Sequence, residues 1–169
     1  MGKRSDAKKA KLKKLLLEYL KNSNRSDRQI AKVLGVSQPT VYMMRNKLLE
    51  NGLVRHFSAI PDLAKMGYEI MVFSFVKFNM DHVMDIENKA KEWAQSHPEI
   101  IFSSRIEGMG MDAITVSLHK NYAEYMIFLT EHKNKWRKFM AKTNHILVDL
   151  GESVAKPLSF KYLAEKKEK

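Results

Sequence analysis

The chain has 169 residues, 44% of them hydrophobic and 29% charged, with a formal net charge of +11 and no cysteine. This composition is typical of a folded globular protein, and the lack of cysteine excludes a disulfide framework, a thiol nucleophile and a cysteine-ligated zinc site. No apolar stretch is long enough to span a membrane and no secretory signal is recognisable, so we expect a cytoplasmic protein without a membrane partner.

The first third of the chain predicts three short helices. Apolar residues recur at helical spacing over residues 12–20, which indicates one buried stripe with lysines on the other faces. Ser26 or Asp27 can cap a second helix, because either side chain can accept a hydrogen bond from a free backbone N–H. A third helix follows within a few residues and is closed by Asn51-Gly52.

The second and third helices have the spacing of a helix-turn-helix. Gly35 permits the sharp turn between them, and Ser37 is a suitable cap for the third helix, with Pro39 in its first turn. In such a motif the outer face of the last helix can enter a DNA major groove. A three-helix bundle with no role in DNA binding would show the same apolar pattern.

The positive charge is concentrated in this third of the chain. Residues 1–60 contain 14 of the 30 Lys and Arg but only 4 of the 19 acidic residues, and so carry a net charge of +10. A basic module joined to a nearly neutral one indicates that the first binds a polyanion and the second has another role. The run from Lys3 to Lys14 alone also fits a solubilising tail, but basic residues continue as far as Arg55.

The rest of the chain predicts an α+β domain of the order β-α-β-β-α-β, the ferredoxin-like plan. The predicted elements are strands at 68–79, 100–107, 112–119 and 144–150, and helices from Asp81 or Asp85 to about His97 and from Tyr122 to Ala141. Residues 157–163 are expected to add an edge strand. The predicted domains are a helix-turn-helix at 1–52, a linker strand at 53–67, a ferredoxin-like domain for ligand sensing and oligomerisation at 68–163, and a frayed tail at 164–169.

Several segments of this sequence resemble the Lrp/AsnC family of prokaryotic transcription regulators, also called feast/famine regulators. The segments are Arg28-Gln-Ile-Ala-Lys-Val-Leu-Gly-Val-Ser-Gln-Pro-Thr-Val41, Leu48-Leu-Glu-Asn-Gly-Leu-Val54, Ala59-Ile60 and Leu63 to Tyr68. The resemblance implies a DNA-binding helix-turn-helix followed by a βαββαβ domain. It also implies a homodimer formed through the sheets, often assembled into an octamer, and often an amino-acid effector bound near subunit contacts.

The sequence departs from the family pattern at two places. Members usually have Arg followed by an aliphatic residue where this chain has Met44-Arg45, so we expect Met44 to fill the core and Arg45 to turn outward toward DNA or solvent. The turn before the third strand usually reads Gly-x-aromatic-Asp. Here it reads Gly108-Met109-Gly110-Met111-Asp112, which is a candidate effector site and equally a tight hairpin between two strands.

The third helix supplies side chains suited to reading DNA. Gln38 or Asn46 could pair with adenine and Arg45 with guanine, whereas Lys47 and other basic residues would contact phosphates. The candidate DNA-contacting residues are Arg28, Ser37, Gln38, Thr40, Tyr42, Arg45, Asn46 and Lys47.

No enzyme is expected from this sequence. The six histidines lack metal-ligand spacing, no cofactor motif occurs, and no carboxylate pair stands out for acid–base chemistry. We therefore predict a sequence-specific transcription regulator that binds double-stranded DNA, with no cofactor or metal. Two alternatives stay open: an enzyme similar to the sirohaem decarboxylases, which share a similar two-module plan, and an architectural protein that coats DNA without reading it.

Overall fold

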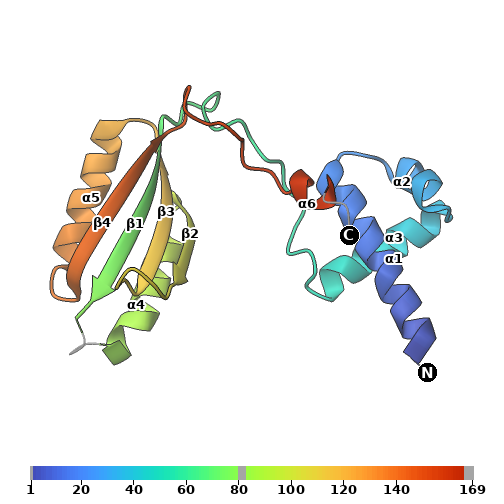
Figure 1. The fold of residues 1–169 in the computed structure, drawn as a ribbon, viewed down its shortest axis with the longest axis horizontal. Coiled ribbons are helices and arrows are strands. Elements are labelled where there is room, and N and C mark those ends of the chain that lie inside the picture. Colours follow the sequence, from blue (N-terminus) through green and yellow to red (C-terminus); the bar gives the residue numbers. More distant parts are fainter. Residues whose placement is uncertain (1, 80–82, 166–169) are drawn as a thin grey trace. The chain divides into compact units, whose positions relative to one another are not determined.

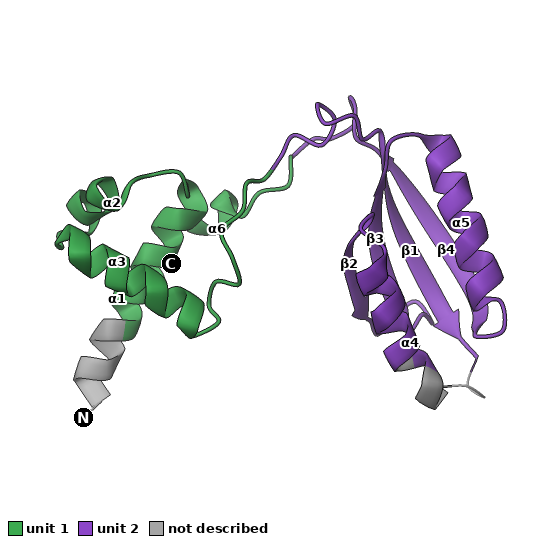
Figure 2. Cartoon of the chain, turned by 180° about the vertical axis from the view of Figure 1, so that it is seen from behind, with its two compact units in different colours: residues 1–60, 157–169 green, residues 61–156 purple. Residues whose placement is uncertain are grey.

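The computed structural model describes residues 2–79 and 83–165, with the side chains of residues 9–79, 86 and 88–165. The chain forms two compact units (Figure 2): unit 1 is residues 1–60 with 157–169, and unit 2 is residues 61–156. Each unit has its own buried core.

Unit 1 is built on three helices, α1 (Gly2–Lys21), α2 (Asp27–Leu34) and α3 (Gln38–Glu50) (Figure 1). Their apolar stripes meet in one cluster. Leu15, Ile30, Val41 and Leu48 in this cluster are fully buried, so each helix contributes at least one of them. The predicted three-helix arrangement is therefore confirmed.

Local signals fix the start and end of α2. Ser26 is its N-cap and forms a capping box with Gln29, each side chain accepting from the other residue's backbone N–H. Gly35 ends the helix with φ of +64°, in the left-handed region that glycine tolerates best. The Val36 N–H then bonds to the Ala31 carbonyl at 3.1 Å, which closes the turn into α3.

Two segments around unit 1 differ from the prediction. Residues 53–67 form no strand; Val54 packs on the three-helix core and the Phe57 ring meets Tyr19 edge-on at 5.0 Å. Residues 157–163 form no edge strand either, because the chain there folds into α6 (Lys161–Glu165), which packs on α1. Tyr-Leu-Ala-Glu favours a helix, and periodicity alone cannot distinguish the two states in so short a segment.

Unit 2 has the ferredoxin-like plan that the sequence predicts. Its elements are β1 (Ile70–Phe78), α4 (Val83–Ser96), β2 (Ile100–Arg105), β3 (Ala113–His119), α5 (Tyr122–Trp136) and β4 (Met140–Asp149). The sheet order is β2-β3-β1-β4 and every neighbouring pair is antiparallel. Asp81, one of the two predicted starts of the helix, lies outside the described residues.

One face of this sheet is covered by α4 and α5. Val72 on β1 packs against Tyr125 and Leu129 of α5, and Trp93 of α4 contacts Phe128 and Trp136 of α5. α5 ends at Trp136, five residues earlier than predicted. The chain turns there because Met140 pairs with Phe78 at the far end of β1. The backbone N–H and C=O groups of this segment form hydrogen bonds in the sheet, and a longer α5 would remove them from it.

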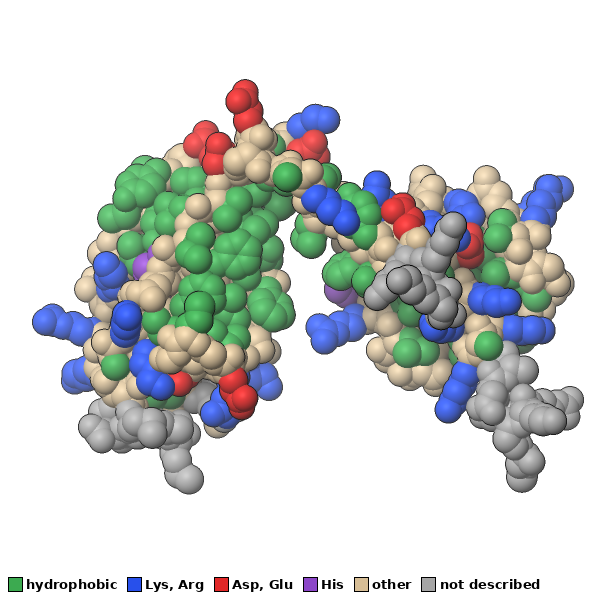
Figure 3. Space-filling model, viewed as in Figure 1, with side chains coloured by type: hydrophobic (Ala, Val, Ile, Leu, Met, Phe, Trp, Pro, Cys, Tyr) green, Lys and Arg blue, Asp and Glu red, His purple; other side chains and the backbone are tan. Residues whose placement is uncertain are grey.

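The other face of the sheet is covered by neither of the described helices of unit 2, α4 and α5 (Figure 1). Side chains alternate between the faces of a strand, so Phe73, next to Val72, points to this open face. Phe73 lies in a row across all four strands, flanked by Ile146 on β4 and Val116 on β3, with Phe102 of β2 beyond Val116. Ile146 and Phe102 are 55% and 54% exposed. Apolar side chains gather over the strands in the space-filling view (Figure 3).

Candidate nucleic-acid interface

Helix α3 carries apolar residues on one side and polar residues on another. Val41, Met44 and Leu48 pack in the core. Gln38, Tyr42 and Asn46 follow one another at intervals of four residues and therefore share another side of the helix. Gln38 and Tyr42 are exposed, Tyr42 by 53%, and Asn46 is half-buried. This side carries donors and acceptors near the helix N-terminus, where a groove-reading helix needs them.

The N-terminus of α3 is fixed by two hydroxyl groups. The Ser37 Oγ accepts from the Thr40 backbone N–H at 3.3 Å, and the two side-chain hydroxyls lie 2.7 Å apart. Pro39 follows within the first turn, where its missing N–H costs nothing. Ser37 and Thr40, both predicted to contact DNA, thus order the helix end that would enter a groove.

Arg45 is held by a network that reaches α1 and α2. Its Nη1 donates to the Asp27 Oδ1 at 3.2 Å, and its guanidinium lies 5.5 Å from the centre of the Tyr42 ring. The Tyr19 hydroxyl donates to the same Asp27 oxygen at 3.4 Å. Met44 packs in the core, as the inverted Met44-Arg45 order predicts, whereas Arg45 is half-buried and pairs with Asp27 of α2 instead of pointing freely outward. No pattern in the sequence reveals the contacts of Asp27 and Tyr19.

The other predicted phosphate-contacting residues surround this site. Arg28 and Lys32 are exposed on α2, and Lys47 is half-buried on α3, seven residues from Thr40 and on the same flank. The exposed lysines of α1 add to this charge; they are Lys9, Lys11, Lys13 and Lys14. Lys and Arg side chains are spread over unit 1 in Figure 3.

Basic neighbours engage two of the acidic residues of unit 1. Glu18 is buried and accepts from Lys21 at 2.6 Å and from Arg25 at 2.5 Å. Its hydrogen bond from Lys21, with a further contribution from Arg25, holds the pKa of Glu18 below its usual value. Asp27 pairs with Arg45.

The predicted effector turn is a tight hairpin anchored to β1. Gly108, Met109 and Gly110 have φ values of +129°, +52° and +68°, and Met111 is buried. The Asp112 carboxylate accepts from the Lys77 Nζ and from the Phe78 backbone N–H, both at 2.8 Å. The Lys77 hydrogen bond, followed by that of Phe78, keeps the pKa of Asp112 below its ordinary value.

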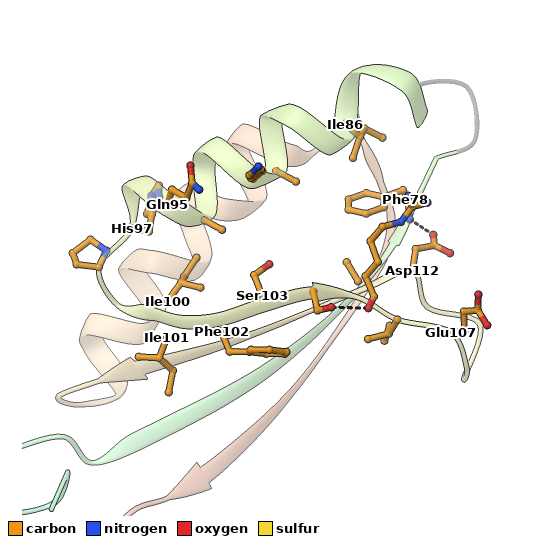
Figure 4. A pocket seen from close by; sticks show the side chains of 18 residues that line it. Phe78, Ile86, Gln95, His97, Ile100, Ile101, Phe102, Ser103, Glu107 and Asp112 are labelled. Carbon is orange, nitrogen blue, oxygen red and sulfur yellow. Dashed lines mark hydrogen bonds between the residues drawn. The ribbon is translucent and has the colours of Figure 1, made fainter. Parts of the chain in front are cut away.

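A hollow of about 1350 Å³ lies beside this turn, between α4 and β2 (Figure 4). Its walls are mostly apolar, with Phe78 and Ile86 toward one end and His97 and Ile100 toward the other. Of the five predicted effector residues, Asp112 lines the hollow, whereas residues 108–111 are not among its lining residues.

Within residues whose positions the structure describes, no group of three or more His, Asp or Glu is arranged to hold a metal ion. None of the helices searched there is long and apolar enough to cross a bilayer.

Both the helix-turn-helix region and the overall fold of this chain are similar to known proteins. A family described as winged helix-turn-helix DNA-binding matches residues 9–55. An uncharacterized HTH-type transcriptional regulator of Pyrococcus furiosus is 35% identical over 80 residues, covering 47% of this chain and 54% of the relative. The HTH-type transcriptional regulator FL11 of Pyrococcus horikoshii is 30% identical over 90 residues, covering 52% and 56%. The chain thus matches about half the length of these relatives.

Solved structures with the same fold cover nearly the whole chain. An AsnC family transcriptional regulator from Agrobacterium tumefaciens aligns with a TM-score of 0.69 at 19% identity, over 90% of this chain and 97% of the other. A Neisseria meningitidis transcriptional regulator, solved as a complex with L-Met, aligns with a TM-score of 0.71 at 14% identity, over 90% and 97%. E. coli AsnC aligns with a TM-score of 0.69 at 16% identity, over 87% and 95%. The fold that the resemblance implies is therefore confirmed: the chain has the fold of the Lrp/AsnC transcription regulators, with a helix-turn-helix followed by a βαββαβ domain.

Proposed function

We propose that the chain is a sequence-specific DNA-binding transcription regulator of the Lrp/AsnC type that acts in the cytoplasm and is not an enzyme. The observation that carries the proposal is the exposed side of α3, where Gln38 and Tyr42 project from a capped helix and where residues 1–60 carry a net charge of +10. Base-edge contacts by these side chains give specificity, and Arg28 and Lys47 contact phosphates.

The second unit brings two recognition helices together. The apolar row Ile146-Phe73-Val116-Phe102 on the open face of the sheet is the surface through which two copies associate, because burying exposed apolar area is favourable. A two-fold symmetric dimer requires a roughly palindromic operator, with half-sites about one helical turn, or a multiple of it, apart. Larger rings, up to an octamer, are built from such dimers.

A small effector, in the simplest case an amino acid, shifts the population of these assemblies. Support comes from the N. meningitidis regulator of the same fold, which was solved with L-Met. In this chain the hollow between α4 and β2, next to the anchored turn of residues 108–112, is the proposed place for it. The Asp112 carboxylate has reduced capacity to bind such an effector, because its two oxygens already accept hydrogen bonds from the Lys77 Nζ and the Phe78 N–H.

Selection of bound sequences from a random DNA pool by the full chain tests the proposal, in parallel with and without a mixture of amino acids. The expected result is a palindromic motif bound about a thousandfold more tightly than random DNA. A specificity ratio near one would instead identify an architectural protein that coats DNA. A tetrapyrrole titration that changes the absorbance spectrum, with no DNA complex at low salt, would favour the decarboxylase-like enzyme.

A further inference from the structure

The side chain of Arg45 is placed by groups from three helices. The same Asp27 oxygen accepts from Arg45 at 3.2 Å and from Tyr19 at 3.4 Å, so the carboxylate connects α3 to α1 as well as to α2. The Tyr42 ring, one turn before Arg45 on α3, stacks beside the guanidinium at 5.5 Å. A long arginine side chain otherwise samples many rotamers, and these contacts restrict it.

The degree of burial sets the strength of this restraint. The Asp27 side chain is 14% exposed and that of Arg45 is 35% exposed, so the ion pair is partly shielded from water while part of the arginine side chain still meets solvent. The guanidinium donates from Nη1 to Asp27 and also interacts with the Tyr19 hydroxyl. A guanidinium has five N–H donors, so others are available for a base edge.

We propose that Asp27 is a positioning residue for DNA reading, which holds the Arg45 guanidinium against α2 and the Tyr42 ring so that its remaining donors face the groove in one orientation. The inference rests on the proposed function. Without the carboxylate, Arg45 is a mobile cation that contacts the nearest phosphate. Phosphate contacts carry no sequence information, so specificity falls while affinity for any DNA is kept or raised.

The variant Asp27→Asn tests this directly, with dissociation constants measured on the selected operator and on random DNA over a range of salt concentrations. The ratio of the two constants is expected to fall about tenfold, the scale of one lost base contact. The salt slope on random DNA is expected to steepen by about 0.9, the value of one added phosphate contact. A purely structural role for Asp27 would weaken both complexes together and would not steepen the slope.

Two controls separate charge and folding from positioning. Glu50→Gln removes one negative charge from the exposed C-terminal end of α3, the helix that carries Arg45, and should change both constants alike. Asp27→Glu keeps a carboxylate at the N-terminus of α2 but moves it by one methylene group, so the ratio should fall by less than in Asp27→Asn. This second variant also gives the answer if Asp27→Asn fails to fold.

The decisive comparison is a double-mutant cycle with Arg45→Ala. If Asp27 acts through Arg45, Asp27→Asn has no further effect on the specificity ratio in the Arg45→Ala background. An unchanged ratio in the folded single variants, or an equal loss in both backgrounds, would overturn the inference while leaving the proposed function intact. A wild-type ratio near one would overturn the proposed function itself.

Discussion

The Trp93 ring lies 4.6 Å from the His132 ring, and both side chains are buried between α4 and α5. Phe128 and Trp136 complete an aromatic wall around this histidine. Burial, together with the nearby His145 and His97, lowers the pKa of His132 to about 4. The neutral imidazole is therefore the form that the folded unit accommodates.

Unit 2 is expected to lose stability as the pH falls below neutrality. An unfolded histidine has a pKa of about 6.5, so the stabilisation from neutral His132 is complete above pH 6.5 and is lost as the pH falls toward 4. The loss amounts to about 3 kcal/mol for this one group. Burial also lowers the pKa of His119 and His145, which adds to the same trend.

Denaturant unfolding followed by tryptophan fluorescence measures this effect, because both tryptophans lie beside His132 in unit 2. His132→Phe should flatten the dependence of the unfolding free energy on pH between 7 and 4.5. Replacement of the exposed His56, in unit 1, serves as the control and should leave it unchanged. A wild-type unfolding free energy that is constant over this range would contradict the prediction.

The N-cap of the recognition helix gives a second prediction. Ser37→Ala removes the bond to the Thr40 N–H and should destabilise unit 1 by about 1 kcal/mol. Ser37→Asn should restore stability, because Asn caps as well as Ser. Thermal unfolding followed by circular dichroism tests both variants. If Ser37→Asn recovers stability but DNA affinity stays low, the hydroxyl itself contacts DNA rather than only capping the helix.

Base reading and phosphate contact are expected to separate along α3. Gln38→Ala and Arg45→Ala should each cost about 1–3 kcal/mol on the operator and much less on random DNA. Lys47→Ala should weaken binding to every sequence alike and reduce the salt slope by about 1. Binding titrations on both DNAs at several salt concentrations check the assignment. Equal losses on the two DNAs for all three variants would show that none of them reads sequence.

Local chemistry explains why much of unit 1 was predictable. A cap such as Ser26 or Ser37 and a left-handed residue such as Gly35 act within four residues of their own position. The residue and the helix end that it sets can therefore be recognised in one short stretch of sequence. The apolar stripes are equally local, since residues three and four apart share a helix face. The element order of unit 2 follows from the same kind of pattern.

The features that were not predictable depend on partners distant in the chain. Arg45 and Asp27 are 18 residues apart, and Lys77 and Asp112 are 35 apart. The early end of α5 follows from the pairing of Met140 with Phe78, across more than sixty residues. Such contacts depend on the tertiary arrangement, which can override local propensity. The spacing of apolar residues along the chain does not predict them.

The open face of the sheet gives the last prediction, which concerns oligomeric state. Ile146 is 55% exposed, so Ile146→Lys costs the isolated unit little, but it places a charge at the β4 end of an apolar row that two copies would bury. Ile127 is 64% exposed on α5, which covers the opposite face of the sheet, and Ile127→Lys is a matched control of equal charge and chemistry. Sedimentation velocity should show a shift toward monomer for Ile146→Lys and none for Ile127→Lys. If the α5 variant dissociates the dimer instead, the subunit contact lies on the helical face of the sheet. Operator binding should weaken in whichever variant dissociates the dimer, because paired half-sites require paired recognition helices.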